Sequence, residues 1–141
     1  MNIRWIPLVL VLSLSSGVSL AEEADAVAQA QTAQQAALAW LAMVDAERYD
    51  DSWDASAPLF QAQVEKAQWG RMAAKARKPL GAKLSREMVV ANYRGELPNA
   101  PDADYVIFNF STEFADGKTW AETVTMMRVA DRWRGLGYFI K

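Results

Sequence analysis

The spacing of apolar residues along the chain changes near residue 84. Before this point apolar side chains recur every three or four residues, as on one face of a helix, and after it they alternate with polar ones, as in a strand. The first pattern predicts a helix over Ala33–Glu47, a brief helix that carries Trp53, and a third helix over residues 58–77. We therefore expect a helical first half and a strand-rich second half.

Four strands are expected in the second half. The clearest covers Asp104–Ala115, where large apolar residues alternate with polar ones, and Leu84–Tyr93 is weaker. Residues Trp120–Val129 and Trp133–Ile140 are also strand-like and are joined by a short hairpin connection. Three helices followed by a four-stranded antiparallel meander predict an α+β domain with the helices packed on one face of the sheet.

The first 21 residues have the layout of a secretory signal peptide. One cation, Arg4, precedes an apolar run, and Ser19-Leu20-Ala21 places small residues at the two positions that a signal peptidase inspects. The apolar run is shorter than the ~20 residues of a membrane span, and an uncleaved anchor helix is the alternative. We therefore expect cleavage after Ala21 and export, to the periplasm.

The mature chain then divides into two parts. Residues 22–32 have few large apolar side chains and are expected to form a flexible start. Residues 33–141 remain as a single domain, because a chain of this size can bury enough surface for one core and not for two.

Composition excludes several kinds of chemistry. The 141 residues include no cysteine and no histidine. A disulfide, a thiolate nucleophile, a Cys- or His-ligated metal site and a Ser-His-Asp triad are therefore all ruled out. Attachment as a lipoprotein through an N-terminal cysteine is ruled out as well. Packing of the core must hold the exported domain together.

The near-neutral total charge of −2 is a sum of opposed blocks. Residues 22–65 carry a net charge of −8 and residues 87–141 a net charge of −2. The block between them has a net charge of +7, from Lys66, Arg71, Lys75, Arg77, Lys78, Lys83 and Arg86. This block is a candidate surface for an anionic lipid or an acidic partner; the alternative, which we favour, is neutralisation by the acidic first helix, within the chain or across a dimer. Nucleic acid is not expected as a partner, since the protein is acidic and has no binding motif.

A cluster of carboxylates lies at the end of the first predicted helix and just after it, at Asp45, Glu47, Asp50, Asp51 and Asp54. Its spacing does not fit a calcium loop, which places acids at alternate positions and closes with a glycine and a later glutamate. Helix caps and solvated turns explain these acids more simply. We expect no metal and no cofactor.

Short strings spread over nearly the whole mature chain resemble a known family. They are Ala39-Trp40-Leu41, Ser52–Phe60, Pro79-Leu80-Gly81, Leu97-Pro98, Ala100-Pro101-Asp102, Glu122–Thr125, Arg132-Trp133-Arg134 and Gly137–Ile140. On these strings the chain resembles the small exported bacterial domains of domain-of-unknown-function family 4019, in the nuclear-transport-factor-2-like (cystatin-like) superfamily. One departure is Gly135, where the family pattern suggests a β-branched residue, and we expect this glycine to weaken or kink the last strand.

The resemblance implies a cone-shaped fold with a cavity between a long helix and a concave sheet. Related domains use this cavity for isomerases, dehydratases, ligand binding or dimer support, and the fold alone does not decide among these uses. No catalytic residue can be transferred, since the family has no assigned activity. Aromatic and sulfur-containing side chains are candidates to line the cavity or, alternatively, to fill the core: Trp40, Trp53, Trp69, Met126, Trp133 and Tyr138.

An isomerase or lyase in such a cavity would need a carboxylate base and a tyrosine or protonated acid. The candidates are Asp45, Tyr49, Asp54, Asn109, Glu113, Glu122, Arg128 and Tyr138. We expect instead that Glu122 and Arg128 form ordinary pairs with Glu113 or Arg134 on neighbouring strands. The leading hypothesis is a non-enzymatic module for a small ligand or a protein partner, dimeric through its sheet, and a small lyase or isomerase is the alternative.

Overall fold

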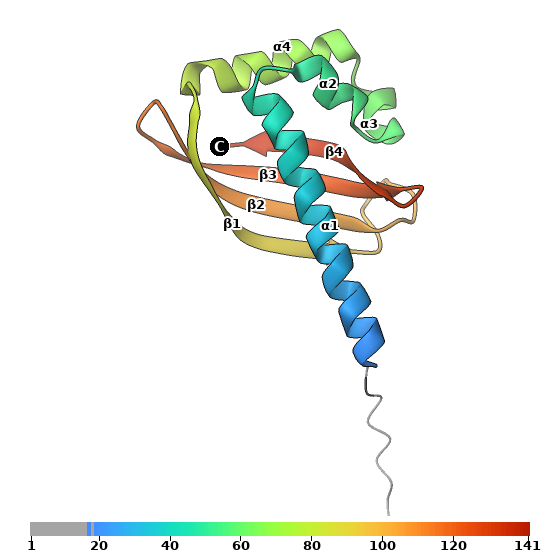
Figure 1. Cartoon of the computed structure of the whole chain (residues 1–141). Coiled ribbons are helices and arrows are strands. Elements are labelled where there is room, and N and C mark those ends of the chain that lie inside the picture. Colours follow the sequence, from blue (N-terminus) through green and yellow to red (C-terminus); the bar gives the residue numbers. More distant parts are fainter. Residues whose placement is uncertain (1–16, 18) are drawn as a thin grey trace, which may run out of the picture.

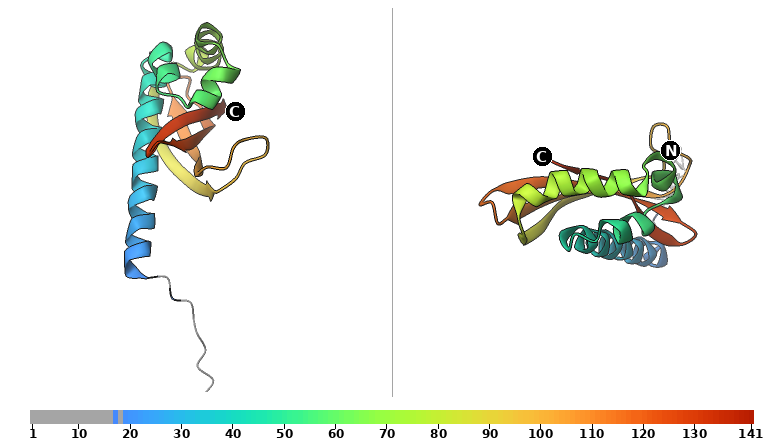
Figure 2. Two further views of the ribbon diagram at one scale, coloured as in Figure 1. Left: turned by 90° about the vertical axis from the view of Figure 1, so that its right-hand side faces the viewer. Right: turned by 90° about the horizontal axis from the view of Figure 1, so that it is seen from above.

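The computed structural model describes residue 17 and residues 19–141, and the predicted signal peptide lies largely outside them (Figure 1). One long helix crosses one face of an antiparallel sheet, and three shorter helices lie along one side of that sheet, next to its last strand (Figures 1 and 2). The helices are α1 (Leu20–Asp45), α2 (Tyr49–Asp54), α3 (Pro58–Gln63) and α4 (Lys66–Arg77), followed by the 3₁₀ turn η1 (Lys78–Leu80).

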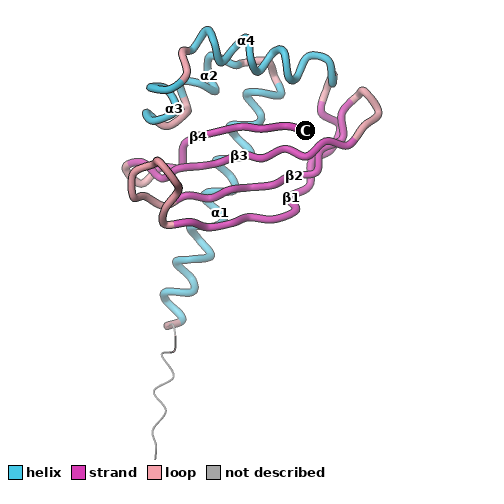
Figure 3. The backbone as a smooth tube through the Cα atoms, turned by 180° about the vertical axis from the view of Figure 1, so that it is seen from behind, coloured by secondary structure: helices cyan, strands magenta, loops and turns pink. Residues whose placement is uncertain are grey.

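The strands form one open sheet in the order in which they follow along the chain (Figure 3). They are β1 (Lys83–Arg94), β2 (Tyr105–Phe114), β3 (Thr119–Val129) and β4 (Arg132–Ile140). Each pairs antiparallel with its neighbour, which confirms the predicted α+β meander. The turn between β3 and β4 places Ala130 and Asp131 at φ 46° and 63°, the backbone that a tight two-residue hairpin requires.

Helix α1 begins at Leu20, well before the predicted start at Ala33. Ser19 caps it, and Glu22 returns the contact to the Ser19 backbone. Residues 22–32, expected as a flexible start, lie in this part of the helix with side chains mostly exposed. The apolar stripe indicates only the buried part of the helix. The helix extends further toward its N-terminus because alanine has a high helix propensity. None of the helices in the described residues has the length and hydropathy to cross a bilayer.

The predicted third helix over residues 58–77 is wrong as one element, because α3 and α4 are separate. Val64, with φ −132° and ψ 118°, and Glu65 are extended between them. The Val64 carbonyl leaves the helix and accepts a hydrogen bond of 2.7 Å from Trp53 Nε1. A β-branched residue at this point leaves a helix at little cost.

The core lies between α1, α4 and the face of the sheet that carries the apolar residues of β2. Val106, Phe108, Phe110 and Phe114 are buried, as their alternation predicted. The aromatic rings of the helical layer continue this core, with Trp40 and Trp69 at a centroid distance of 5.6 Å. The opposite face of the sheet carries no helix (Figure 2).

Gly135 allows a close contact between α1 and β4, which the family pattern did not suggest. The indole of Trp40 lies directly on it, since a Cβ added there would be 2.5 Å from Trp40 Nε1. The Gly135 carbonyl also accepts a hydrogen bond of 2.7 Å from the Ala57 backbone. A bulge does follow, with Leu136 as the extra residue of β4. Glycine is therefore required at position 135 for a close approach of helix and strand.

Candidate functional site

A cluster of charged side chains is buried where the helices meet the sheet. Its members come from five elements: Asp45 ends α1, Arg77 ends α4, Arg86 lies on β1, Glu122 on β3 and Tyr138 on β4. Both arginine side chains are only 5% exposed, and that of Glu122 is fully buried. We call these five residues the ionic cluster.

Arg86 is the centre of the ionic cluster. Its two terminal nitrogens bind both oxygens of Asp45, at 2.8 and 2.9 Å, and its Nε donates to Glu122 Oε1 at 2.8 Å. Arg77 donates a further hydrogen bond of 2.7 Å to Asp45. Tyr138 donates to the other oxygen of Glu122. Two acids and two guanidinium groups therefore balance in charge, and each acid is held by several donors.

The surroundings of the ionic cluster oppose acid–base chemistry. Burial by itself raises the pKa of Asp45, but hydrogen bonds and charge from Arg86 and Arg77 outweigh burial, so that the pKa lies below its ordinary value. Burial and then the charge of Glu122 raise the pKa of the Tyr138 hydroxyl. At neutral pH Asp45 is charged and Tyr138 is protonated. Both carboxylates are held in ion pairs, while the buried Arg77 Nε has no hydrogen-bond partner among the residues that the structure describes.

The predicted strand-to-strand pairs of Glu122 and Arg128 are wrong. Glu122 lies on the core face, whereas Glu113 points to the opposite face and is exposed. Arg128 instead bonds Asp104 at 3.4 Å and Asp131 at 3.0 Å, beside its own hairpin. The alternation of β3 had already put Glu122 on the apolar face, but its partner Arg86 comes from β1, two strands away, which pairwise register alone does not reveal.

Some cations of the basic block, residues 66–86, form ion pairs within the fold. Arg77 and Arg86 belong to the ionic cluster, and Lys66 pairs with Asp54 at 2.7 Å. These three cations are thus neutralised within the chain, but the first helix supplies only Asp45, whereas Asp54 lies on α2 and Glu122 on β3. The remaining four, Arg71, Lys75, Lys78 and Lys83, are exposed.

The acids that follow α1 separate from one another. Asp45 enters the ionic cluster, Asp51 pairs with Arg48 at 2.7 Å and Asp54 pairs with Lys66. Glu47 lies in the turn after α1 at φ 59°. Within the described residues no group of three acids gathers in a way that could hold a metal ion.

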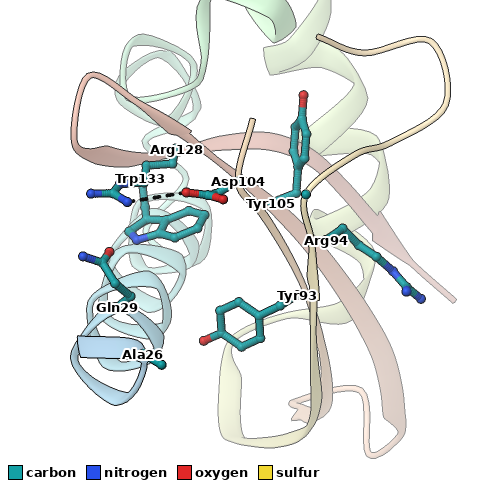
Figure 4. Close-up of a pocket in the computed structure, with 9 residues that line it drawn as sticks. Ala26, Gln29, Tyr93, Arg94, Asp104, Tyr105, Arg128 and Trp133 are labelled. Carbon is teal, nitrogen blue, oxygen red and sulfur yellow. Dashed lines mark hydrogen bonds and ion pairs between the residues drawn. The ribbon is translucent and has the colours of Figure 1, made fainter. Parts of the chain in front are cut away.

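A pocket with mostly apolar walls lies between the exposed half of α1 and one end of the sheet (Figure 4). Its volume is about 390 Å³. Trp133 and Tyr93 present their rings to it, and Ala26 and Gln29 of α1 form the wall on the helical side (Figure 4). Its other lining residues are Arg94, Gly95, Asp104, Tyr105 and Arg128. We call this cavity the aromatic pocket.

The six aromatic and methionine candidates are dispersed. Trp40, Trp69 and Met126 fill the core, and Tyr138 belongs to the ionic cluster. Trp133 reaches the aromatic pocket, and together with Trp40 and Met126 it also lines a smaller groove of about 200 Å³ further along α1. Trp53 is half-buried, with Lys66 above its ring.

The aromatic pocket contains residues that the sequence did not single out, above all Tyr93. This residue lies one position before the end of the strand with the weakest alternation, and it is 49% exposed. Its pairing with Val106 places it on the core face, beyond the part that α1 covers. A search for aromatic residues at the ends of core-facing strands would have found it.

Comparison with known proteins gives one match. Residues 36–138 match the family described as a protein of unknown function (DUF4019). This range runs from the middle of α1 to Tyr138 and includes the ionic cluster, together with every lining residue of the aromatic pocket except Ala26 and Gln29. No curated protein and no solved structure matches the chain.

Proposed function

We propose that this chain, which belongs to the DUF4019 family, is a non-enzymatic module. It binds a small, flat, largely apolar ligand in the aromatic pocket. The observation that carries the proposal is the arrangement of Trp133 and Tyr93 around a cavity of about 390 Å³. Small-ligand sites in proteins have volumes of roughly 300–1,000 Å³ and mostly apolar walls.

The polar groups of the aromatic pocket suit a binding role. The Gln29 amide and the Arg128 guanidinium stand at its rim and can bond the polar edge of a ring compound (Figure 4). Asp104 pairs with Arg128 at 3.4 Å, so that this acid and this cation offset each other in charge. Rigid aromatic walls lose little conformational entropy on binding.

The alternative of a lyase or isomerase has weaker support. Its acids would have to come from the ionic cluster, where arginines already hold both carboxylates. The cavity beside Asp45 and Arg77 has a volume of about 40 Å³. Such a space has room for one or two water molecules and for no substrate of ordinary size.

Export and the superfamily fold are also part of the proposal. The layout of residues 1–21 supports a cleaved signal peptide, and one long helix across an antiparallel sheet is consistent with a nuclear-transport-factor-2-like domain. The intact mass of the protein purified from the periplasm tests export. A chain that starts at Glu22 is expected, and a mass that includes residues 1–21 would indicate the uncleaved anchor instead.

The ligand proposal is tested by native mass spectrometry of that same periplasmic protein, followed by NMR titration with indole and with naphthoate. We expect a retained small molecule and shifts of the Ala26 and Tyr93 amide signals. Tyr93→Ala should weaken binding about tenfold, because it removes one aromatic wall. Phe139→Ala is the matched control, since Phe139 is also exposed but lies on the opposite face of the sheet. Equal affinities for the two variants, or no shift near the pocket, would reject the proposal.

A further inference from the structure

Strand β1 is the one strand of the described sheet with solvent on both faces along most of its length. It is at the edge of the sheet, and its outer N–H and C=O groups have no strand beside them in the part of the chain that the structure describes. Its exposed apolar side chains are Leu84, Met88, Val89, Val90 and Tyr93. A long apolar edge of this kind is a template for pairing with another strand.

Helix α1 is much longer than the sheet that it covers. In a mature chain that starts at Glu22, its remaining 24 residues span about 36 Å, whereas four strands span about 15 Å. It packs on β2, β3 and β4, and its N-terminal part runs past β1 into solvent (Figures 1 and 2). The face that buries Ala33 and Ala37 continues through Ala30 and Ala26 into this overhang. The helix therefore offers a small-residue apolar surface where the sheet has ended.

We propose that a second copy of this chain fills this place, with the two β1 strands paired antiparallel about a two-fold axis. The sheet then continues from one copy into the other, and the overhang of each α1 covers the β1 strand of the other copy. One molecule carries both halves of the contact, the open edge and the unsupported helix, which is what a two-fold interface requires.

Charge supports the same partner. Antiparallel pairing brings the start of one β1 beside the end of the other. The overhang leaves the sheet near Tyr93, at the end of β1, because Ala26 and Gln29 lie there. Its acids Glu22, Glu23 and Asp25 would then approach Lys83 of the second copy. The interface and the aromatic pocket share Tyr93 and Ala26, so the variants that test the interface are placed at other residues, Val89, Glu23 and Lys83.

The oligomeric state and its geometry test the interface. Sedimentation equilibrium of the secreted protein should give a dimer. The chain has no cysteine, so single cysteines placed in turn at Ser85, Glu87, Val90 and Asn92 report on neighbours without background. At least one of them, next to the two-fold axis, should form an intermolecular disulfide on mild oxidation, and Phe139→Cys should form none.

A substitution on the edge and a charge reversal across the interface decide whether the edge and the overhang act together. Val89→Lys should weaken dimerisation about tenfold or more, whereas Phe139→Lys, equally exposed on the far strand, should not. Glu23→Lys and Lys83→Glu should each weaken the dimer, and the double variant should restore it. A monomer at all concentrations, a dimer that crosslinks through Phe139→Cys, or a β1 edge occupied by a different protein would overturn the proposal.

Discussion

The two edge strands of the sheet, β1 and β4, differ in whether another segment of the chain covers them. The edge of β4 is covered, because the link between α2 and α3 crosses it: Ser56 bridges Gly135, and the Ala57 N–H donates to the Gly135 carbonyl at 2.7 Å. The edge of β1 has no such cover within the described residues and exposes its apolar side chains. A meander always ends in two edges, and here the helical layer closes only one of them.

The attachment of the two strands to the helices also differs in its chemistry. Strand β4 is held by close packing, since the Trp40 indole rests on the Gly135 backbone. Strand β1 reaches the helices through a charged group, since Arg86 binds Asp45 at the end of α1. The comparison therefore predicts that the attachment of β1 to the helices depends on the ion pairs of Arg86. The attachment of β4 depends on the absence of a side chain at Gly135.

The largest effect is expected at Arg86. Arg86→Ala leaves Asp45 and the buried Glu122 without their main partner, which should lower the free energy of unfolding by about 3–5 kcal/mol. Arg94→Ala, an exposed arginine on the same strand, is the control and should change it by less than about 0.5 kcal/mol. Urea unfolding followed by tryptophan fluorescence measures both. Similar losses for the two variants would show that β1 does not depend on the ionic cluster.

A smaller loss is expected for Gly135→Ala. The added Cβ would lie 2.5 Å from Trp40 Nε1, so the indole must move and strain its hydrogen bond to the Ser52 carbonyl. The expected cost is about 1–3 kcal/mol, measured by thermal unfolding. Gly137→Ala is the matched control, because a Cβ there meets Thr125 at an ordinary 4.0 Å. Should Gly135→Ala melt at the wild-type temperature, the packing of Trp40 on β4 would not be tight.

The smallest effect concerns Tyr138 and has a defined pH dependence. Burial and the charge of Glu122 hold the pKa of the Tyr138 hydroxyl above its ordinary 10.0 in the folded protein. The hydroxyl therefore stabilises the fold fully below pH 10, and this contribution is lost as the pH rises further, because the unfolded chain releases the proton first. Tyr138→Phe should cost about 1.5 kcal/mol at neutral pH, the lower end for a hydrogen bond to a charged group. The gap between wild type and variant should narrow above pH 10, and a gap independent of pH would contradict the proposed protonation state.

The predictions made from sequence succeeded where a property depends on neighbours along the chain. The strands and their order followed from the alternation of apolar residues, and the turn at Ala130-Asp131 followed from the short gap between two strands. The buried stripe of α1 was also found. The start of α1 was missed because apolar spacing reports burial, whereas alanine-rich sequence forms helix without it.

The candidate sites were less accessible to such reasoning. The ionic cluster joins residues from five elements, and its central pair, Arg86 and Asp45, meets only after α1 has been laid across the sheet. Val64 and Glu65 interrupt a helix because Trp53 takes the Val64 carbonyl from outside it. The ionic cluster and the break between α3 and α4 both depend on contacts between segments that are not adjacent in sequence. A local sequence pattern does not predict such contacts.

Local preference and the period of the side chains thus account for which segments are helix or strand and which face of each is apolar. The absence of thiol and imidazole chemistry follows from composition alone. The relative placement of the segments is a different kind of property. It made a pocket beside Tyr93, because α1 is longer than the sheet is wide, and it covered β4 and not β1, because the link between α2 and α3 crosses only β4. Both results exist only once the segments are assembled.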